Sequence, residues 1–236
     1  MIAVFRREFK SFFTNPIGYV VLAVMFCTSG LFFYVYNLAS GMSTLSYLYS
    51  SLFTIVLLII PFLTMRLFSE EKRQKTDQAL FTAPAGLTGI VLGKFFAALA
   101  LFALALAITL VYAVVIAIAG VTPDWVVVFG NFLGLLLVGG LMISIGLLIS
   151  SLTESQVIAA LGTLAVSVIL LSVDMLGSIF SAISWLADAI SFVSINSRYI
   201  NFTVGLIEYD NIIFFLSLQA LFIFITVRVL DSKRWK

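Results

Sequence analysis

The sequence predicts an all-α, polytopic membrane protein that spans the bilayer with six helices. Of its 236 residues, 62% are hydrophobic and 10% are charged, whereas a soluble domain is about half apolar and about one-quarter charged. The mean hydropathy is +1.19, and several apolar stretches are each long enough to cross roughly 30 Å of hydrocarbon. We therefore expect one membrane domain over residues 1–236.

Six apolar stretches are predicted as spans, and their even number places both termini on one side of the membrane. Twelve of the 13 Lys and Arg residues lie in the N-terminus, in the 66–94 segment and in the C-terminus, and only Arg198 lies on the opposite side. The positive-inside rule then predicts a multi-pass protein of the cell's inner (cytoplasmic) membrane with both termini in the cytoplasm. The predicted spans are Ile17–Leu38, Leu45–Leu67, Ile90–Ala119, Trp125–Leu152, Val157–Val173 and Asn211–Leu230.

The first sixteen residues predict an amphipathic helix that lies in the headgroup layer before Pro16 turns the chain upright. Large apolar side chains recur on one helical face, and basic side chains lie largely on the other. The alternative is an ordinary basic flank that serves only topology. The residues assigned to this interfacial helix, 1–16, include Phe5, Arg6, Arg7, Phe9 and Lys10.

The third span is predicted to begin near Thr88, a plausible N-cap, and to continue without a break to Ala119. Thirty-two helical residues extend about 48 Å, and the hydrocarbon needs only about 20 residues. We therefore expect the first two turns to stand in the cytoplasm, with Lys94 reaching the phosphate layer.

Two long connections remain, and the outer one covers residues 174–210. Its first half, Leu176–Phe192, mixes serines and an aspartate with large apolar side chains. This composition favours short re-entrant helices that dip into the outer leaflet between spans five and six. The alternative is another full crossing, which would move the C-terminus to the outer side.

The other long connection, residues 68–89, contains the sequence SEEKRQKTDQALFTAP, in which six of sixteen residues are charged. Glu71 and Lys75, and likewise Glu70 and Arg73, have the spacing of helical ion pairs. The second span is therefore expected to continue as a helix beyond the membrane.

A second short helix is predicted after this extension, capped by Thr76 or Asp77 and ending before Pro84. It would present Leu80 and Phe81 to the cytoplasm, with charged residues around them. An exposed apolar pair of this kind predicts a docking element for another protein. The alternative is a solvated charged loop that only maintains topology.

Several kinds of chemistry are excluded by composition. The chain has no histidine and a single cysteine, Cys27, which excludes histidine acid–base catalysis and a disulfide framework. The only Gly-Lys pair, Gly93-Lys94, is followed by Phe95, so no phosphate-binding P-loop is present. Ion-coupled transport is disfavoured because no acidic residue lies near the middle of a span. We expect no catalytic residue, metal site or bound cofactor in this chain.

The stretch from Ile60 to Phe96 resembles the cytoplasmic signature of ABC-2 type permeases, the membrane subunits of a class of ATP-driven exporters. The loop SSLTESQ at 150–156 and the end of the chain are also similar to this family, and the start, REFKSFFTNPIGYV, is most similar to the gliding-motility-associated permeases. Asp77 and Gln78 stand where the family more often has Leu and Glu. The matching positions are Glu71, Lys72, Thr76, Leu80, Pro84, Leu92, Gly93 and Lys94.

The resemblance implies a transmembrane permease subunit that couples ATP hydrolysis by a separate cytoplasmic ATPase to export of an unidentified substrate. It also implies that ATP and Mg bind to the ATPase, that the permease is a homodimer or one of a pair within the lipid bilayer, and that no nucleic acid is involved. The alternative function is a membrane scaffold or channel-like subunit that recruits another cytoplasmic protein. The implied ATPase-coupling residues are Glu71, Lys72, Thr76, Asp77, Gln78, Ala79, Leu80, Phe81 and Pro84.

Overall fold

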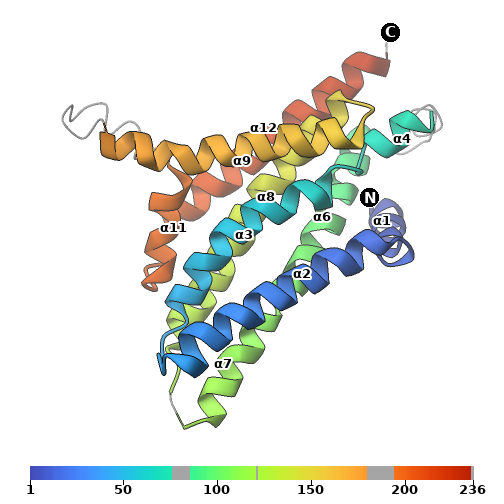
Figure 1. The fold of residues 1–236 in the computed structure, drawn as a ribbon. Coiled ribbons are helices and arrows are strands. Elements are labelled where there is room, and N and C mark those ends of the chain that lie inside the picture. The colour runs from blue at the N-terminus through green and yellow to red at the C-terminus, as the bar shows by residue number, and fades with distance from the viewer. Residues whose placement is uncertain (76–85, 121, 180–193, 235–236) are drawn as a thin grey trace.

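The computed structural model describes residues 1–75, 86–120, 122–179 and 194–234, whose regular structure is entirely helical (Figure 1). The short helix α1 precedes six long, apolar helical stretches, and the small helices α4 and α11 lie between them. The elements are α1 (Ile2–Thr14), α2 (Pro16–Phe33) with its π-helical continuation η1 (Tyr34–Ala39), α3 (Ser46–Thr64), α4 (Ser69–Arg73), α6 (Leu87–Leu106), α7 (Ile108–Ile118), α8 (Trp125–Leu152), α9 (Gln156–Ile179), α11 (Ile195–Thr203) and α12 (Tyr209–Arg234).

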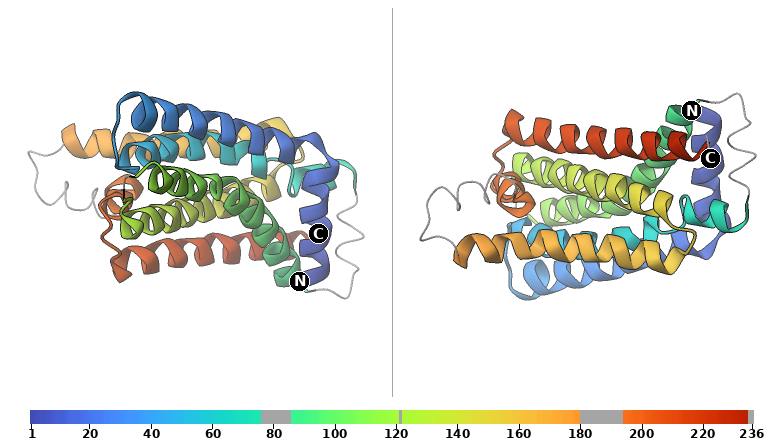
Figure 2. Two further views of the ribbon diagram at one scale, coloured as in Figure 1. Left: turned by 90° about the horizontal axis from the view of Figure 1, so that it is seen from below. Right: turned by 90° about the horizontal axis from the view of Figure 1, so that it is seen from above.

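Six of these stretches are long and apolar enough to cross a membrane, and they coincide with the six predicted spans. The prediction of an all-α, six-span protein is therefore confirmed. Both chain termini lie at the end of the molecule that carries α1 and α4 (Figure 2). The stretches are Pro16–Ala39, Ser46–Arg73, Leu87–Ile118, Trp125–Leu152, Gln156–Val173 and Tyr209–Ser232.

Helix α8 is the centre of the bundle and packs against α3, α6, α9, α11 and α12. Its glycines allow neighbouring helices to approach closely, as small residues do in membrane proteins. A Cβ atom on Gly139 would lie 2.1 Å from the Phe102 ring of α6, and one on Gly146 would lie 2.2 Å from Thr64 of α3. These two positions therefore require glycine if α3 and α6 are to stay where they are.

The third span differs from its prediction in two details. Its helix begins at Leu87 after an extended Gly86, so Thr88 is not the N-cap. It is also interrupted at Ala107, between α6 and α7. Next to the break, the Thr109 hydroxyl donates to the Leu106 carbonyl (2.7 Å) and accepts from the Tyr49 hydroxyl of α3 (3.0 Å). A side-chain bond of this type competes with the backbone bonds and bends helices, which explains why an unbroken helix was the wrong expectation.

The short helix α11 packs on α3, α8 and α9 at the end of the bundle opposite to α1 and α4 (Figure 2). The Tyr199 ring of α11 stacks on Phe53 of α3 with 4.8 Å between ring centres, and its hydroxyl donates to the Tyr49 carbonyl (3.1 Å). Helix α9 continues to Ile179, and residues 180–193 of the predicted outer helices lie outside the described residues. Entry of this segment into the outer leaflet stays a prediction.

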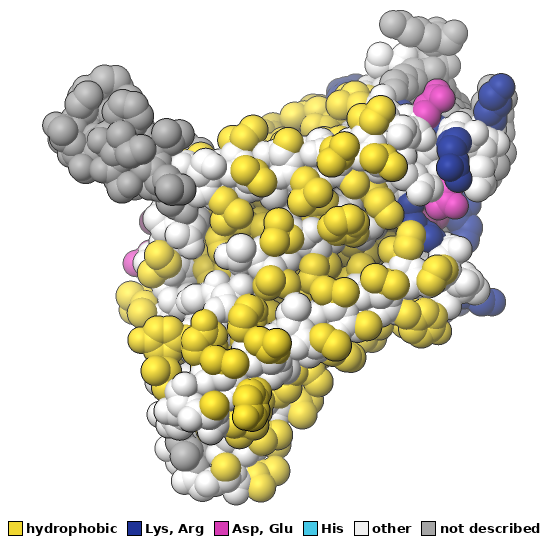
Figure 3. Space-filling model, viewed as in Figure 1, with side chains coloured by type: hydrophobic (Ala, Val, Ile, Leu, Met, Phe, Trp, Pro, Cys, Tyr) yellow, Lys and Arg dark blue, Asp and Glu magenta, His cyan; other side chains and the backbone are white. Residues whose placement is uncertain are grey.

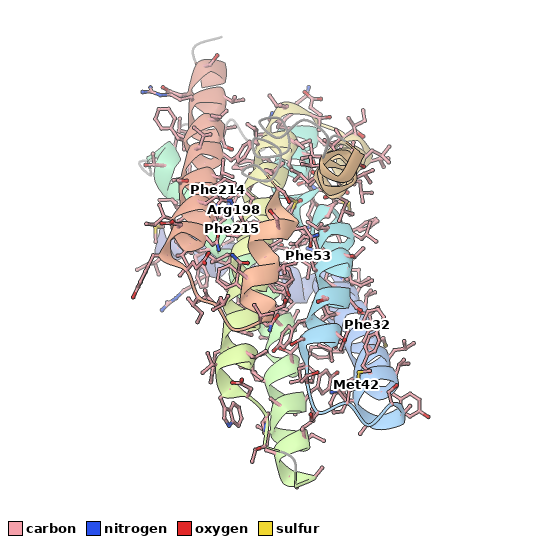
Figure 4. The ribbon with its side chains drawn as sticks, turned by 90° about the vertical axis from the view of Figure 1, so that its left-hand side faces the viewer. Phe32, Met42, Phe53, Arg198, Phe214 and Phe215 are labelled. Atoms are coloured by element: carbon pink, nitrogen blue, oxygen red, sulfur yellow. The ribbon has the colours of Figure 1, made fainter. Side chains whose placement is uncertain are left out.

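Arg198, the one Lys or Arg residue predicted for the outer side, is held between α11 and α12. Its guanidinium carbon lies 4.1 Å from the centre of the Phe214 ring, and the group donates to the Asn211 side-chain oxygen (3.0 Å) (Figure 4). The charge is therefore used to join two helices within the bundle.

Substitution of Gly139 tests the close packing around α8. We expect Gly139→Ala to destabilise the protein by about 1–3 kcal/mol, because the new methyl group displaces the buried Phe102 ring. Gly30→Ala is the matched control, since its Cβ would meet only the Tyr112 hydroxyl at 3.4 Å. Unfolding of both variants in detergent measures the difference, and equal stabilities would contradict the packing argument.

Candidate functional site at the charged end of the bundle

Charged side chains gather at the end of the molecule formed by α1 and α4 (Figure 3). The predicted amphipathic helix is present as α1, which packs against α6 and α2. The rings of Phe5, Phe9 and Phe13 follow one another along it, with centres 5.8 and 5.2 Å apart. Arg6 and Lys10 are exposed. The helix fits the headgroup layer by its composition, and that location stays a prediction.

Lys94 of α6 is fully enclosed at this end, with 1% of its side chain exposed. Its ammonium nitrogen lies 3.2 Å from a carboxylate oxygen of Glu8 and 3.0 Å from one of Glu71, and it donates to the Leu67 carbonyl (2.6 Å). The expectation that Lys94 reaches the phosphate layer was therefore wrong. Helices α1 and α4 cover the start of α6, and two carboxylates compensate the lysine for its lost hydration.

Arg7 completes the group from the solvent side. One guanidinium nitrogen lies 2.7 Å from Glu8 and 2.8 Å from Glu71, on the same carboxylate oxygens that contact Lys94. We call Arg7, Glu8, Glu71 and Lys94 the charge network. It joins α1, α4 and α6, three segments that are far apart in the sequence, and its four charges sum to zero.

The charge network shifts the pKa values of its members on α1. Burial alone would raise the pKa of Glu8, but Lys94 and Arg7 outweigh it, so this pKa lies below its usual value. Burial would lower the pKa of Arg7, but Glu8 and Glu71 raise it above its ordinary value. Both shifts favour the charged forms, as expected for partners that compensate one another.

Arg66, at the end of the second span, makes a second connection to α1. It donates to the Ser11 hydroxyl (2.8 Å), pairs with Glu70 at 3.7 Å, and lies 5.8 Å from the centre of the Phe12 ring. A polar cavity of about 330 Å³ lies between this contact and the charge network. Two contacts therefore attach the second span to α1: Arg66 makes one just before α4, and Glu71 makes the other within α4.

The last turn of α8 also contacts the start of α4. The Ser150 hydroxyl accepts from the backbone N–H groups of Phe68 (3.0 Å) and Ser69 (3.1 Å), and the Lys72 ammonium donates to the Ser151 carbonyl. The first turn of the charged segment is thus fixed to the end of α8 as well as to α1 and α6.

The ion pairs of α4 differ from those predicted along a helix. Helix α4 ends at Arg73, and Lys75 has a left-handed φ of 56°, so it does not continue the helical turn that would bring it next to Glu71. Glu71 contacts Arg7 and Lys94, and Glu70 contacts Arg66. Glu71 therefore has tertiary partners, whereas Glu70 has a local partner one turn earlier in the chain, at the i,i+4 spacing.

The structure therefore places two of the predicted coupling residues, Glu71 and Lys72, at the junction of four helices. The predicted docking helix itself is not described, and its two apolar residues stay a prediction. The remaining coupling residues outside the described part of the chain are Thr76, Asp77, Gln78, Ala79, Leu80, Phe81 and Pro84.

Sequence reasoning missed that Glu8 and Lys94 are partners. The available signal was Lys94 itself, because a lysine within an otherwise apolar helix needs a compensating anion when it is enclosed. The sequence offers several carboxylates on that side of the membrane, and spacing alone does not select Glu8 among them.

The fold and the site together define a six-span helical membrane protein with a charged segment, fixed by ion pairs, at one end. A family model described as "ABC-2 family transporter protein" matches residues 2–234. The chain belongs to this family and is a permease subunit of an ABC transporter, as its resemblance to the ABC-2 permeases implied. No individual curated protein matches the chain.

Removal of the Lys94 charge tests the charge network. We expect Lys94→Met to lower the free energy of unfolding by about 3 kcal/mol, because Glu8 and Glu71 lose their enclosed cation. Adding Glu8→Gln to this variant should recover part of the loss. Unfolding in detergent measures both effects, and Lys10→Met at an exposed position of α1 is the control. A Lys94 variant as stable as its control would refute a structural role for the ion pairs.

The lowered pKa of Glu8 predicts a pH dependence of stability. A lowered folded-state pKa gives stability that is present above the ordinary value of 4.5 and is lost as the pH falls through the folded-state value. We therefore expect the free energy of unfolding to fall below about pH 4.5, and Glu8→Gln to reduce that slope. Unfolding measured from pH 7 to pH 3 tests this, with Glu154→Gln at an exposed site as control. Identical slopes for both variants would contradict the assignment.

Proposed function

We propose that this permease subunit exports a substrate under the power of a separate cytoplasmic ATPase, and that the 68–89 segment is where the ATPase acts. This proposal rests on the charge network. The network fixes α4, which is the first turn of that segment, to α1 and α6. In this proposal the ATPase binds ATP and Mg, and residues 76–83 move with it when it closes.

The contacts of α4 suggest how such a movement is transmitted. Glu71 joins α4 to α6, which begins the third span, and to α1, which leads through Pro16 into the first span. Lys72 and the backbone of Ser69 join it to the last turn of α8, just before the connection to span five. Separating buried ion pairs is costly, so these elements should move as one body and transmit the displacement to the first five spans.

A second permease copy, or a paired permease, is proposed to cover the face formed by α2, α3 and α9. An apolar groove of about 390 Å³ lies between α2 and α3, lined by residues such as Val24 and Phe62. Hydrophobic side chains extend over this face (Figure 3). Spans one, two and five would then border the export path and rearrange when the ATPase closes.

The proposal also covers the orientation of the chain in the membrane and its subgroup within the permease family. The gathering of Lys and Arg at the end with α1 and α4 supports a cytoplasmic location for both termini in the inner membrane. The likeness of the first twenty residues supports a place near the gliding-motility-associated permeases.

Crosslinking from the coupling segment tests the proposed function. Ala79→Cys is introduced after Cys27, which is exposed, has been replaced by Ala. We expect crosslinking in native membranes to capture a P-loop ATPase, identified by mass spectrometry, and the yield to change with ATP and vanadate. A well-expressed variant that captures no ATPase would favour a scaffold that recruits another protein.

A pair of double variants supplies the control. Leu80→Asn with Phe81→Asn should abolish co-purification of the ATPase, because it removes the apolar pair proposed to dock. Leu206→Asn with Tyr209→Asn replaces two exposed side chains (56% and 82% exposed) at the opposite end of the bundle and should leave co-purification unchanged.

A further inference from the structure

An apolar groove of about 590 Å³ lies between α6 and α12. Helix α12 lines it from Leu216 to Arg228, and Thr88 and Leu92 at the start of α6 form the other wall. The start of α6 and the end of α12 lie together at the end of the molecule that carries α1 (Figure 2).

The length of the groove matches one leaflet of a bilayer. The twelve-residue step from Leu216 to Arg228 corresponds to about 18 Å of helix. One leaflet contributes about half of the roughly 30 Å hydrocarbon thickness. Because Arg228 lies one turn from the end of the sixth span at Ser232, the groove extends from the headgroup level toward the bilayer centre.

The two ends of the groove differ in chemistry. Toward the bilayer centre its walls are apolar, formed by residues such as Leu216, Ala220 and Ile223. The amide of Gln219, also in the wall, is already engaged, because it donates to the Leu137 carbonyl of α8 (2.9 Å). At the headgroup end lie the Arg228 guanidinium and the Thr88 hydroxyl, which can both donate hydrogen bonds.

Arg228 is exposed and differs from the three ion-paired cations at this end of the bundle. Arg7, Arg66 and Lys94 each contact a carboxylate. In the described part of the chain, no carboxylate oxygen lies within 4.0 Å of the Arg228 guanidinium, although Asp231 follows one turn later. Its guanidinium carbon lies 5.1 Å from the centre of the Phe224 ring, another residue of the groove wall.

We propose that this groove binds a bilayer phospholipid with an anionic headgroup. One acyl chain lies along α12 against Leu92, and the phosphate accepts hydrogen bonds from Arg228 and Thr88. Charge complementarity selects this occupant: a planar guanidinium donates two parallel hydrogen bonds to a phosphate, and an anionic headgroup, unlike a zwitterionic one, has no cation of its own to oppose Arg228. A second permease copy is the less suitable occupant, since the separate apolar face of α2 and α3 is available for it. The lipid is a resident of the permease, and its binding does not require the proposed movement of residues 76–83.

Photolabelling with two lipids that share one diazirine-bearing acyl chain tests the proposal on the purified protein in nanodiscs. One lipid is phosphatidylglycerol, and the other is zwitterionic phosphatidylcholine. Mass spectrometry of the peptides locates the label. We expect phosphatidylglycerol to label the Leu216–Phe224 stretch about fivefold more than phosphatidylcholine, which is the effect of one basic residue near an anionic lipid.

Four variants separate the phosphate contact from the acyl-chain contact. Arg228→Gln should remove the preference for phosphatidylglycerol, so that the two lipids label the groove about equally. Arg228→Lys should retain most of the preference. Arg73→Gln, at an exposed site outside the groove, should leave it unchanged. Ala220→Trp should block labelling of the groove by both lipids, and its exposed neighbour substituted as Leu221→Trp should not. Equal labelling by the two lipids, a preference unaffected by Arg228→Gln, or no labelling in the groove would each overturn the proposal.

Discussion

The enclosure of the Lys94 charge is the constraint on which the arrangement of the whole charged end depends. An ammonium group with 1% of its side chain exposed is stable only if anions replace its water. Glu8 and Glu71 are those anions, and each comes from a different helix. The positions of α1 and α4 on α6 follow from this requirement, since both helices must bring a carboxylate to the same nitrogen.

The same constraint explains why α1 is more than an amphipathic helix with two faces. Its phenylalanines pack along one side, and Arg6 and Lys10 are exposed. Glu8 and Ser11 form a third side that points into the protein, toward Lys94 and Arg66. The helix is therefore joined by polar contacts to two different spans, which a helix held only by its apolar face would not be.

Most of the fold could be predicted from sequence, because the apolar stretches are long and bounded by charged or helix-breaking residues. The six spans and the helix before Pro16 depend on local composition, which is visible in the chain. The partners of Lys94 and the break at Ala107 could not be predicted. The first depends on a contact between distant segments, Glu8 with Lys94. The second depends on the Thr109 hydroxyl, which donates to the nearby Leu106 carbonyl while it accepts from the distant Tyr49. The ion pair expected between Glu71 and Lys75 was wrong because Glu71 contacts the distant residues Arg7 and Lys94.

The charge network also determines when α1 can dock onto the bundle during synthesis of the protein. Helix α1 leaves the ribosome before α6, so its inward-facing Glu8 cannot pair with Lys94 until α6 has been made. Two spans must therefore be inserted while α1 is still undocked, and its basic side chains are free to set the orientation of the first span during that interval. Docking of α1 onto α6 would then mark the point at which the first three spans become one unit.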